Sequence, residues 1–161
     1  MDKNVNYYTV DLYNKEETYN LVSFFNELCS TFGNNLIYFG VGISFYSEKV
    51  DHLDLLDFID SYDKSNLIIK KEDKDGYIDE ILFSINFSKI DAYKILNFIK
   101  YFRHSYIYFL RKEKTIDDFR KEFDAFSFFK FRFSDSRYLN IINASLLCDS
   151  DHSNFKLTSL L

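Results

Sequence analysis

The hydrophobic pattern of this 161-residue chain alternates between the spacing of a helix and the spacing of a strand. From Lys15 to about Thr31, apolar residues recur every three or four positions, as in an amphipathic helix. Asn14 precedes this stretch as a candidate N-cap, and Gly33 follows it as a helix stop. The pattern therefore predicts a helix over this range.

Segments typical of strands flank and follow this helix. Val5–Tyr13 contains the alternation expected of a strand, and Leu36–Ser47 is rich in β-forming residues, with Gly40 and Gly42 indicating a bulge or a tight turn. Two further β-rich runs, Asn66–Glu72 and Tyr77–Phe87, flank Asp75-Gly76, a dipeptide favoured in two-residue hairpin turns. We expect these two runs to form one antiparallel hairpin.

The rest of the chain continues the same mixture of elements. Val50–Asp63 is predicted as a second helix, Ser88 is expected to cap a third that runs to about Arg103, and Thr115 a short fourth that runs to about Phe126. The remaining strands are expected at Tyr106–Leu110, Phe128–Phe133, Tyr138–Leu147 and Phe155–Leu160. The fold class predicted is α+β, with a mixed or antiparallel sheet and helices packed against it.

The two halves of the chain resemble each other in their apolar positions. The helix beginning at Lys15 aligns without a gap with the stretch beginning at Lys89, and Leu36–Phe39 aligns with Tyr106–Phe109. One interpretation is a duplication of a βαβαβ unit, 5–72 and 77–135, joined by the hairpin and followed by a 136–161 extension. The alternative is that any two amphipathic segments of such composition would match. Either way, the length predicts a single domain over 1–161.

Several features indicate a cytoplasmic setting. The first residues lack the basic and apolar regions of a secretory signal, and the longest apolar run, Leu36–Tyr46, is too short to span a bilayer. The two cysteines, Cys29 and Cys148, lie far apart in the sequence and do not suggest a disulfide framework. We therefore expect no membrane partner.

Charge is distributed unevenly along the chain. Residues 1–80 contain 16 acids and 7 bases, whereas residues 81–161 contain 9 acids and 13 bases. In the predicted second helix, aspartates recur every third position, which favours an exposed acidic ridge, although an ordinary solvated helix face is the alternative. A second acidic group surrounds the hairpin turn. The candidate partner-binding residues are Asp51, Asp54, Asp57, Asp60, Asp63, Asp73, Asp75, Asp79 and Glu80.

No motif in the sequence indicates catalysis or a cofactor. The three histidines, His52, His104 and His152, show no zinc-binding spacing, and we assign no metal ligand, no cofactor and no catalytic residue. If the glycine of the calcium-binding loop pattern is aligned with Gly76, Lys71 and Leu82 fall where the loop needs carboxylates, which argues against a calcium site. A basic patch from Arg103, Arg111, Lys112 and Lys114 is a weak nucleic-acid signal, and the net charge of −5 opposes phosphate binding.

These observations favour a stoichiometric protein inhibitor, an immunity protein or antitoxin whose acidic surface blocks a basic toxin of the nuclease type. One alternative is a phage or mobile-element anti-defence protein that mimics a nucleic acid. Another is a small enzyme with a site that no motif reveals. The sequence leaves the oligomeric state open.

Overall fold

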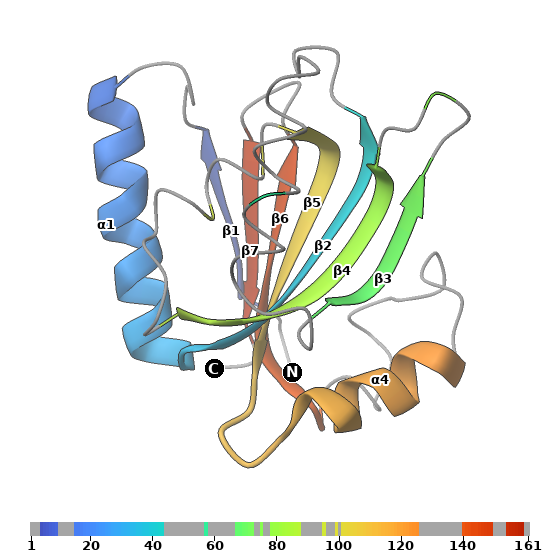
Figure 1. The fold of residues 1–161 in the computed structure, drawn as a ribbon. Helices are drawn as coiled ribbons and strands as arrows, with labels where there is room; N and C mark the ends of the chain where they lie inside the picture. Colours follow the sequence, from blue (N-terminus) through green and yellow to red (C-terminus); the bar gives the residue numbers. More distant parts are fainter. Residues whose placement is uncertain are drawn as a thin grey trace.

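The computed structural model describes residues 4–9, 15–43, 57, 67–72, 75, 78–87, 95, 99, 101–125, 140–149 and 154–159. The elements described over their whole length are a seven-stranded sheet, one long helix and one short helix, and residues 57, 95, 99 and 101 are helical as well. The sheet order is β1-β7-β6-β5-β2-β4-β3, and all six strand pairings are antiparallel. The α+β prediction with an antiparallel sheet is confirmed (Figure 1).

The strands come from the whole length of the chain. They are β1 (Asn4–Thr9), β2 (Asn35–Ile43), β3 (Leu67–Glu72), β4 (Ile78–Asn86), β5 (Phe102–Leu110), β6 (Ile142–Asp149) and β7 (Asn154–Ser159). Strand β1 pairs with β7, so segments from the two ends of the chain lie side by side at one edge of the sheet. Strand β3 forms the other edge.

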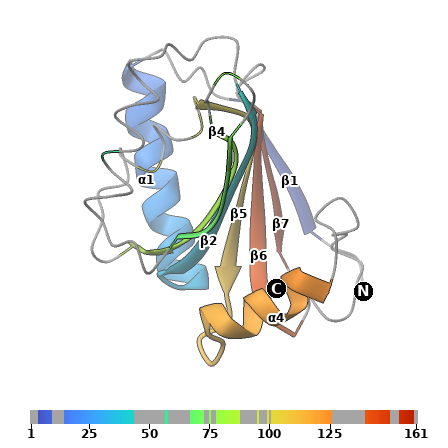
Figure 2. The same ribbon diagram turned by 45° about the vertical axis from the view of Figure 1, so that its right-hand side comes forward.

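Helix α1 (Lys15–Phe32) packs along one face of the sheet, as Figure 2 shows. It forms because Leu21, Phe25 and Leu28 recur at helical spacing and are all buried. It ends at Gly33, whose φ of 106° is accessible to glycine at little cost and whose N–H donates to the Cys29 carbonyl at 2.9 Å. The helix and its stop are therefore confirmed.

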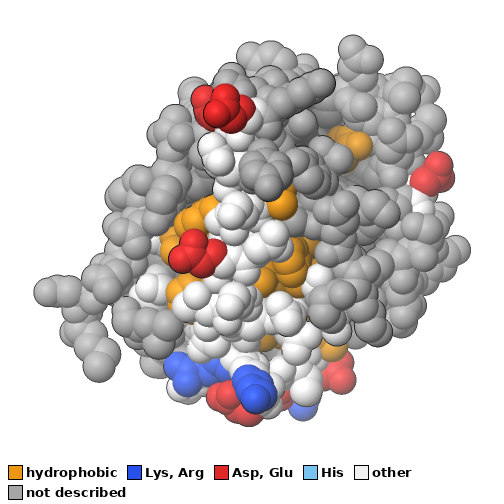
Figure 3. Space-filling view, turned by 90° about the vertical axis from the view of Figure 1, so that its left-hand side faces the viewer, with side chains coloured by type: hydrophobic (Ala, Val, Ile, Leu, Met, Phe, Trp, Pro, Cys, Tyr) orange, Lys and Arg blue, Asp and Glu red, His pale blue; other side chains and the backbone are white. Residues whose placement is uncertain are grey.

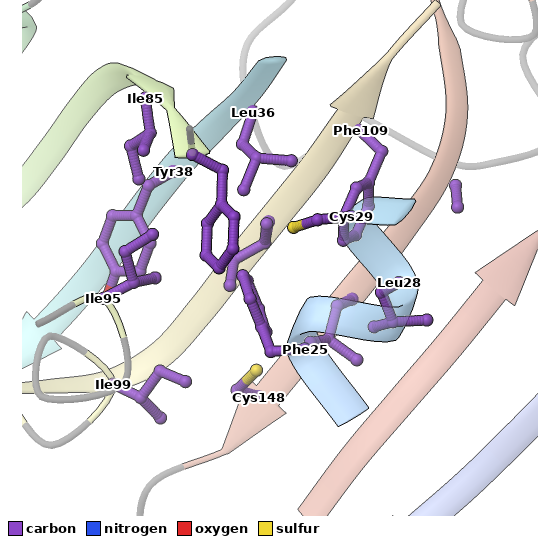
Figure 4. Packing of buried hydrophobic residues seen from close by; sticks show 14 of the residues in the cluster. Phe25, Leu28, Cys29, Leu36, Tyr38, Ile85, Ile95, Ile99, Phe109 and Cys148 are labelled. Carbon is purple, nitrogen blue, oxygen red and sulfur yellow. The ribbon is translucent and has the colours of Figure 1, made fainter. Parts of the chain in front are cut away.

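Both faces of the sheet are covered over its centre, and strand β2 contributes to both cores. Leu36 and Tyr38 belong to the cluster under α1, which we call the α1 core; Figure 4 shows Phe25, Leu28 and Cys29 projecting from α1 into it. Ile37 and Phe39 belong to a second cluster on the opposite face, the α4 core. Because alternate residues are buried on both sides, this strand reads as a continuous apolar run without alternation.

Helix α4 (Ile116–Ala125) closes the end of the α4 core. A capping box begins it: the Thr115 N–H donates to Asp118 Oδ2 at 2.8 Å, and the Asp118 N–H donates to Thr115 Oγ1 at 3.3 Å. Phe119 is 1% exposed and packs against the Tyr108 ring at 5.6 Å between centroids. The predicted Thr115 cap and the short helix after it are confirmed.

The two glycines of β2 have different roles from the bulge or turn that the sequence suggested. The pairing of β2 with β5 keeps one register from Leu36 to Ile43, so no bulge interrupts it. Gly40 is required because a Cβ there would collide with the Phe102 ring. Gly42 has a φ of 70°, a conformation that other residues rarely adopt.

The hairpin of β3 and β4 forms where the sequence placed it. Lys70 pairs with Ile81 and Lys71 with Glu80, the register that a two-residue turn at 75–76 would produce. The register then shifts between Lys71 and Glu72, so the ladder is irregular next to the turn. The long antiparallel hairpin is therefore confirmed.

Strand β5 begins earlier than the sequence pattern indicated. The third helix was expected to continue to about Arg103, but the last helical residue is Tyr101 and Phe102 already pairs with Ile43 of β2. The Phe102 ring fills the space over Gly40, and this tertiary contact outweighs the helical spacing of the preceding residues. Residues Ile95 and Ile99 are helical, as expected.

The expected terminal strands are confirmed as β6 and β7. Strand β1 begins at Asn4, one residue before the predicted range Val5–Tyr13, and otherwise lies within that range. The strand expected at Phe128–Phe133 lies outside the described residues. The sheet order does not show the duplication: β4 lies beside β2, but its proposed counterpart β1 lies beside β7 and not beside β5.

Candidate functional site

The structure describes only one residue of the predicted acidic ridge. Asp57 is helical and its side chain is exposed, as a ridge would require. The other four ridge residues lie outside the described residues: Asp51, Asp54, Asp60 and Asp63. The ridge as a whole stays a prediction.

The second acidic group lies on the β3–β4 hairpin. Asp75 is exposed in the turn, and Glu80 is half-buried on β4, two strands from the centre of the sheet order. Asp79 is a residue of β4 whose backbone is described, while Asp73 lies outside the described residues. The hairpin thus places Asp75, Asp79 and Glu80 within one supersecondary unit, and nothing described relates them in space to Asp57.

Acidic side chains that the sequence did not single out lie on α1. Glu16 and Glu27 are exposed, Glu17 is half-buried, and the last turn of the helix carries no basic residue. Figure 3 faces the side of the molecule where α1 lies: acidic side chains stand apart from one another along it, and basic side chains gather at its lower end with acidic ones beside them. Among the described side chains on this side, acidic ones are sparse.

The weak basic patch is not brought together. Arg103 follows the first residue of β5 and Arg111 follows its last, so about 27 Å of extended strand separates them. Lys112 is exposed and Lys114 is half-buried in the loop that leads to α4, and Lys114 contributes to lowering the pKa of the Asp118 carboxyl. These cations therefore do not form one continuous nucleic-acid surface.

A more concentrated arrangement of polar residues crosses the sheet at the other end of the α4-core face. His104 of β5 pairs in register with Val41 of β2 on one side and with Asp149 of β6 on the other. Val41 in turn pairs with Glu80 of β4. We call Glu80, Val41, His104 and Asp149 the polar row; residues opposite one another in antiparallel strands share a face of the sheet.

The described members of the polar row are all half-buried: Glu80, Val41 and His104. Two positions further along β4, β2 and β5, the residues on the same face are apolar or aromatic. Phe39 is 1% exposed, Leu82 is fully buried, and the half-buried Tyr106 stacks on Tyr108 with ring planes 8° apart. The polar row thus borders the α4 core.

The α1 core holds a different polar group, sealed from solvent. The hydroxyl oxygens of Tyr38 and Ser105 lie 2.6 Å apart in a hydrogen bond, and Ser105 pairs in register with Cys148. Burial raises the pKa of Tyr38 and Cys148 well above their ordinary values and that of Cys29 to about 12. Because the neutral forms are held this strongly, these groups are unsuited to act as nucleophiles or bases.

Among the residues whose placement is described, no three or more His, Cys, Asp or Glu side chains gather so as to hold a metal ion. Over the same part of the chain, no helix combines the length and the apolar character that crossing a membrane needs.

No protein-family model, no curated protein and no solved structure matches this chain.

Nothing in the sequence links His104 with Asp149, because they are 45 residues apart and fit no metal or catalytic spacing. The signal that could have found them is the alternation of β5, in which His104 shares a face with Tyr106 and Tyr108. That alternation identifies a face but not the strands that flank it.

Proposed function

We propose that this chain is a stoichiometric protein inhibitor, an immunity protein or antitoxin, that binds a basic toxin of the nuclease type through an acidic surface. The observation that carries the proposal is the exposed, helical Asp57 at the centre of a stretch with an aspartate at every third position. The exposed Asp75 at the hairpin turn adds a second acidic position.

The physical basis is competition for cations. A nuclease presents lysines and arginines to the phosphate backbone, so a carboxylate-rich surface can occupy the same site. Opposite charges also steer the two proteins together, which raises the association rate at low ionic strength by up to about a thousandfold. The excess of acids in residues 1–80, 16 against 7 bases, supplies the field that this steering needs.

The test is co-expression of the chain with the products of the genes adjacent to its own, followed by purification of any complex that forms and measurement of its affinity at several salt concentrations. We expect a one-to-one complex whose affinity falls steeply as salt rises. Replacing Asp54, Asp57 and Asp60 together by Asn should weaken the complex through faster dissociation and slower association, without changing the free energy of unfolding by more than about 0.5 kcal/mol.

The matched control is a triple variant of equal charge change in the more basic half, Glu113→Gln, Asp117→Asn and Glu122→Gln, on or next to α4. We expect this control to bind as tightly as the parent chain. Equal losses in both triple variants would mean that net charge, and not the aspartate-rich helix, determines binding. Full binding and protection by the first triple variant would overturn the acidic-surface mechanism.

A further inference from the structure

The β3–β4 hairpin carries an exposed carboxylate next to a residue without a side chain. Asp75 is an exposed turn residue, and Gly76 follows it in the sequence. The ladder between the two strands becomes irregular close to this turn, where the register shifts between Lys71 and Glu72. Asp75 thus lies in neither a helix nor a strand, beside an irregular stretch of the sheet.

An aspartate followed by glycine can react with its own backbone. The nitrogen of the following residue attacks the carbon of the protonated side-chain carboxyl, the amide proton and the carboxyl OH leave as water, and a succinimide ring forms. A water molecule then opens the ring at either carbonyl, which returns aspartate or produces isoaspartate, in which the main chain runs through the former side chain. Glycine favours ring closure because it puts no side chain near the attacking nitrogen and restricts the backbone least.

The other described aspartates with exposed side chains are held differently. Asp57 is helical, and a phenylalanine follows it in the sequence. Asp117 is the second residue of α4, and the nitrogen that would attack its carboxyl belongs to Asp118. The N–H of that nitrogen already donates to Thr115 Oγ1 at 3.3 Å in the helix cap. Among the described aspartates with exposed side chains, only Asp75 combines a turn conformation with a following glycine.

We propose that Asp75 is a site of spontaneous succinimide formation and isoaspartate modification, with water as the only co-reactant. The product keeps its negative charge, but the main chain gains one methylene at the turn and the carboxylate moves to a new position. Since Asp75 is one of the exposed candidate partner-binding residues, the acidic group at the hairpin changes as the protein ages. The inference is independent of the inhibitor function, because it requires only the fold of the hairpin.

The experiment is incubation of the folded full-length protein at neutral pH and physiological temperature for several weeks. Digestion then uses an endoprotease that cleaves before aspartate but not before isoaspartate, and mass spectrometry measures how far each aspartate resists cleavage. We expect isoaspartate to accumulate several-fold faster at Asp75 than at Asp117, because the α4 cap engages the Asp118 N–H. In denaturing urea this ratio should fall, since the cap is lost.

Matched variants assign the reaction to this position. Asp75→Glu should remove the signal while keeping the charge of the turn, because glutamate would have to close a larger, less favourable ring. Asp117→Glu is the control and should leave the rate at Asp75 unchanged. Gly76→Ala should slow the reaction, because its methyl group hinders the attacking nitrogen.

Circular dichroism checks the fold of each variant, and if Gly76→Ala unfolds, the two glutamate variants decide. Equal accumulation at Asp75 and Asp117 in the folded parent protein, or none at Asp75, would overturn the proposal.

Discussion

The two faces of the sheet are built from the same strands but differ in how completely they are covered. The face under α1 is closed by the helix, and even its polar groups, Tyr38 and Ser105, are satisfied inside the core by a 2.6 Å hydrogen bond. The opposite face is closed by α4 at one end and passes into half-buried Glu80, Val41 and His104 at the other. The two faces therefore differ in how completely their described side chains are buried.

The largest expected effect tests the closed face. Phe25→Ala should lower the free energy of unfolding by about 3–5 kcal/mol, because it leaves a cavity between α1 and the sheet. Phe25 is fully buried and packs against the rings of Phe87 and Phe109, with centroids 5.3 and 6.2 Å away. Urea unfolding measures the loss, and Ser23→Ala, an exposed position of the same helix, is the control. A loss below 1 kcal/mol would mean that α1 does not seal this face.

A second prediction concerns the polar pair inside the α1 core. Tyr38→Phe and Ser105→Ala should each cost about 1–3 kcal/mol, because either change leaves the remaining buried hydroxyl without its partner. The double variant should cost less than the sum of the two, since it removes both polar groups. Strict additivity in this double-mutant cycle, measured by urea unfolding, would show that the two hydroxyls do not act as a pair.

The cap of α4 should have a smaller effect on the other core. Thr115→Ala should lower the free energy of unfolding by about 1 kcal/mol, because the Asp118 N–H loses its acceptor at the start of the helix that covers Phe39 and Tyr108. Thermal unfolding at neutral pH measures this effect. The exposed Lys121→Ala on the same helix is the control, and an equal loss there would attribute the effect to the helix surface.

The same cap predicts a dependence on pH. The Thr115 backbone N–H, followed by its hydroxyl, holds the pKa of the Asp118 carboxyl below its ordinary 3.8. A lowered folded-state pKa means that the carboxylate stabilises the fold fully above the unfolded-state pKa and loses this contribution as pH falls through the folded-state value. Asp118→Asn should therefore reduce stability at pH 7 and make little difference in strong acid. A deficit that persisted in acid would contradict this origin.

The smallest effect is expected on the polar row. His104→Gln should change the free energy of unfolding by less than about 0.5 kcal/mol, because a half-buried polar side chain is replaced by another. Chemical unfolding at neutral pH measures it. A loss of several kcal/mol would show that this end of the sheet is as closed as the face under α1, and would remove the contrast between the two.

Local sequence patterns were sufficient to predict an element when the residues that determine it all lie within one segment. The spacing of Leu21, Phe25 and Leu28 with Gly33 after them predicts α1 closely, and Asp75-Gly76 predicts the hairpin register at Lys71 and Glu80. The boundary at Phe102 escaped prediction because the contact that determines it, the ring over Gly40, joins residues 62 positions apart. Of the candidate partner-binding residues, Asp57 and Asp75 are exposed as expected, and Glu80 is half-buried.

By itself the sequence determined the elements that local spacing, caps and turn residues encode, together with the charge asymmetry of the two halves. Only the tertiary structure decided the strand order, and with it which side chains are neighbours. Strand β5 lies between β2 and β6, so His104 stands between Val41 and Asp149. Pairing of distant strands depends on burying both faces of the sheet at once, a property of the whole chain that no single segment carries.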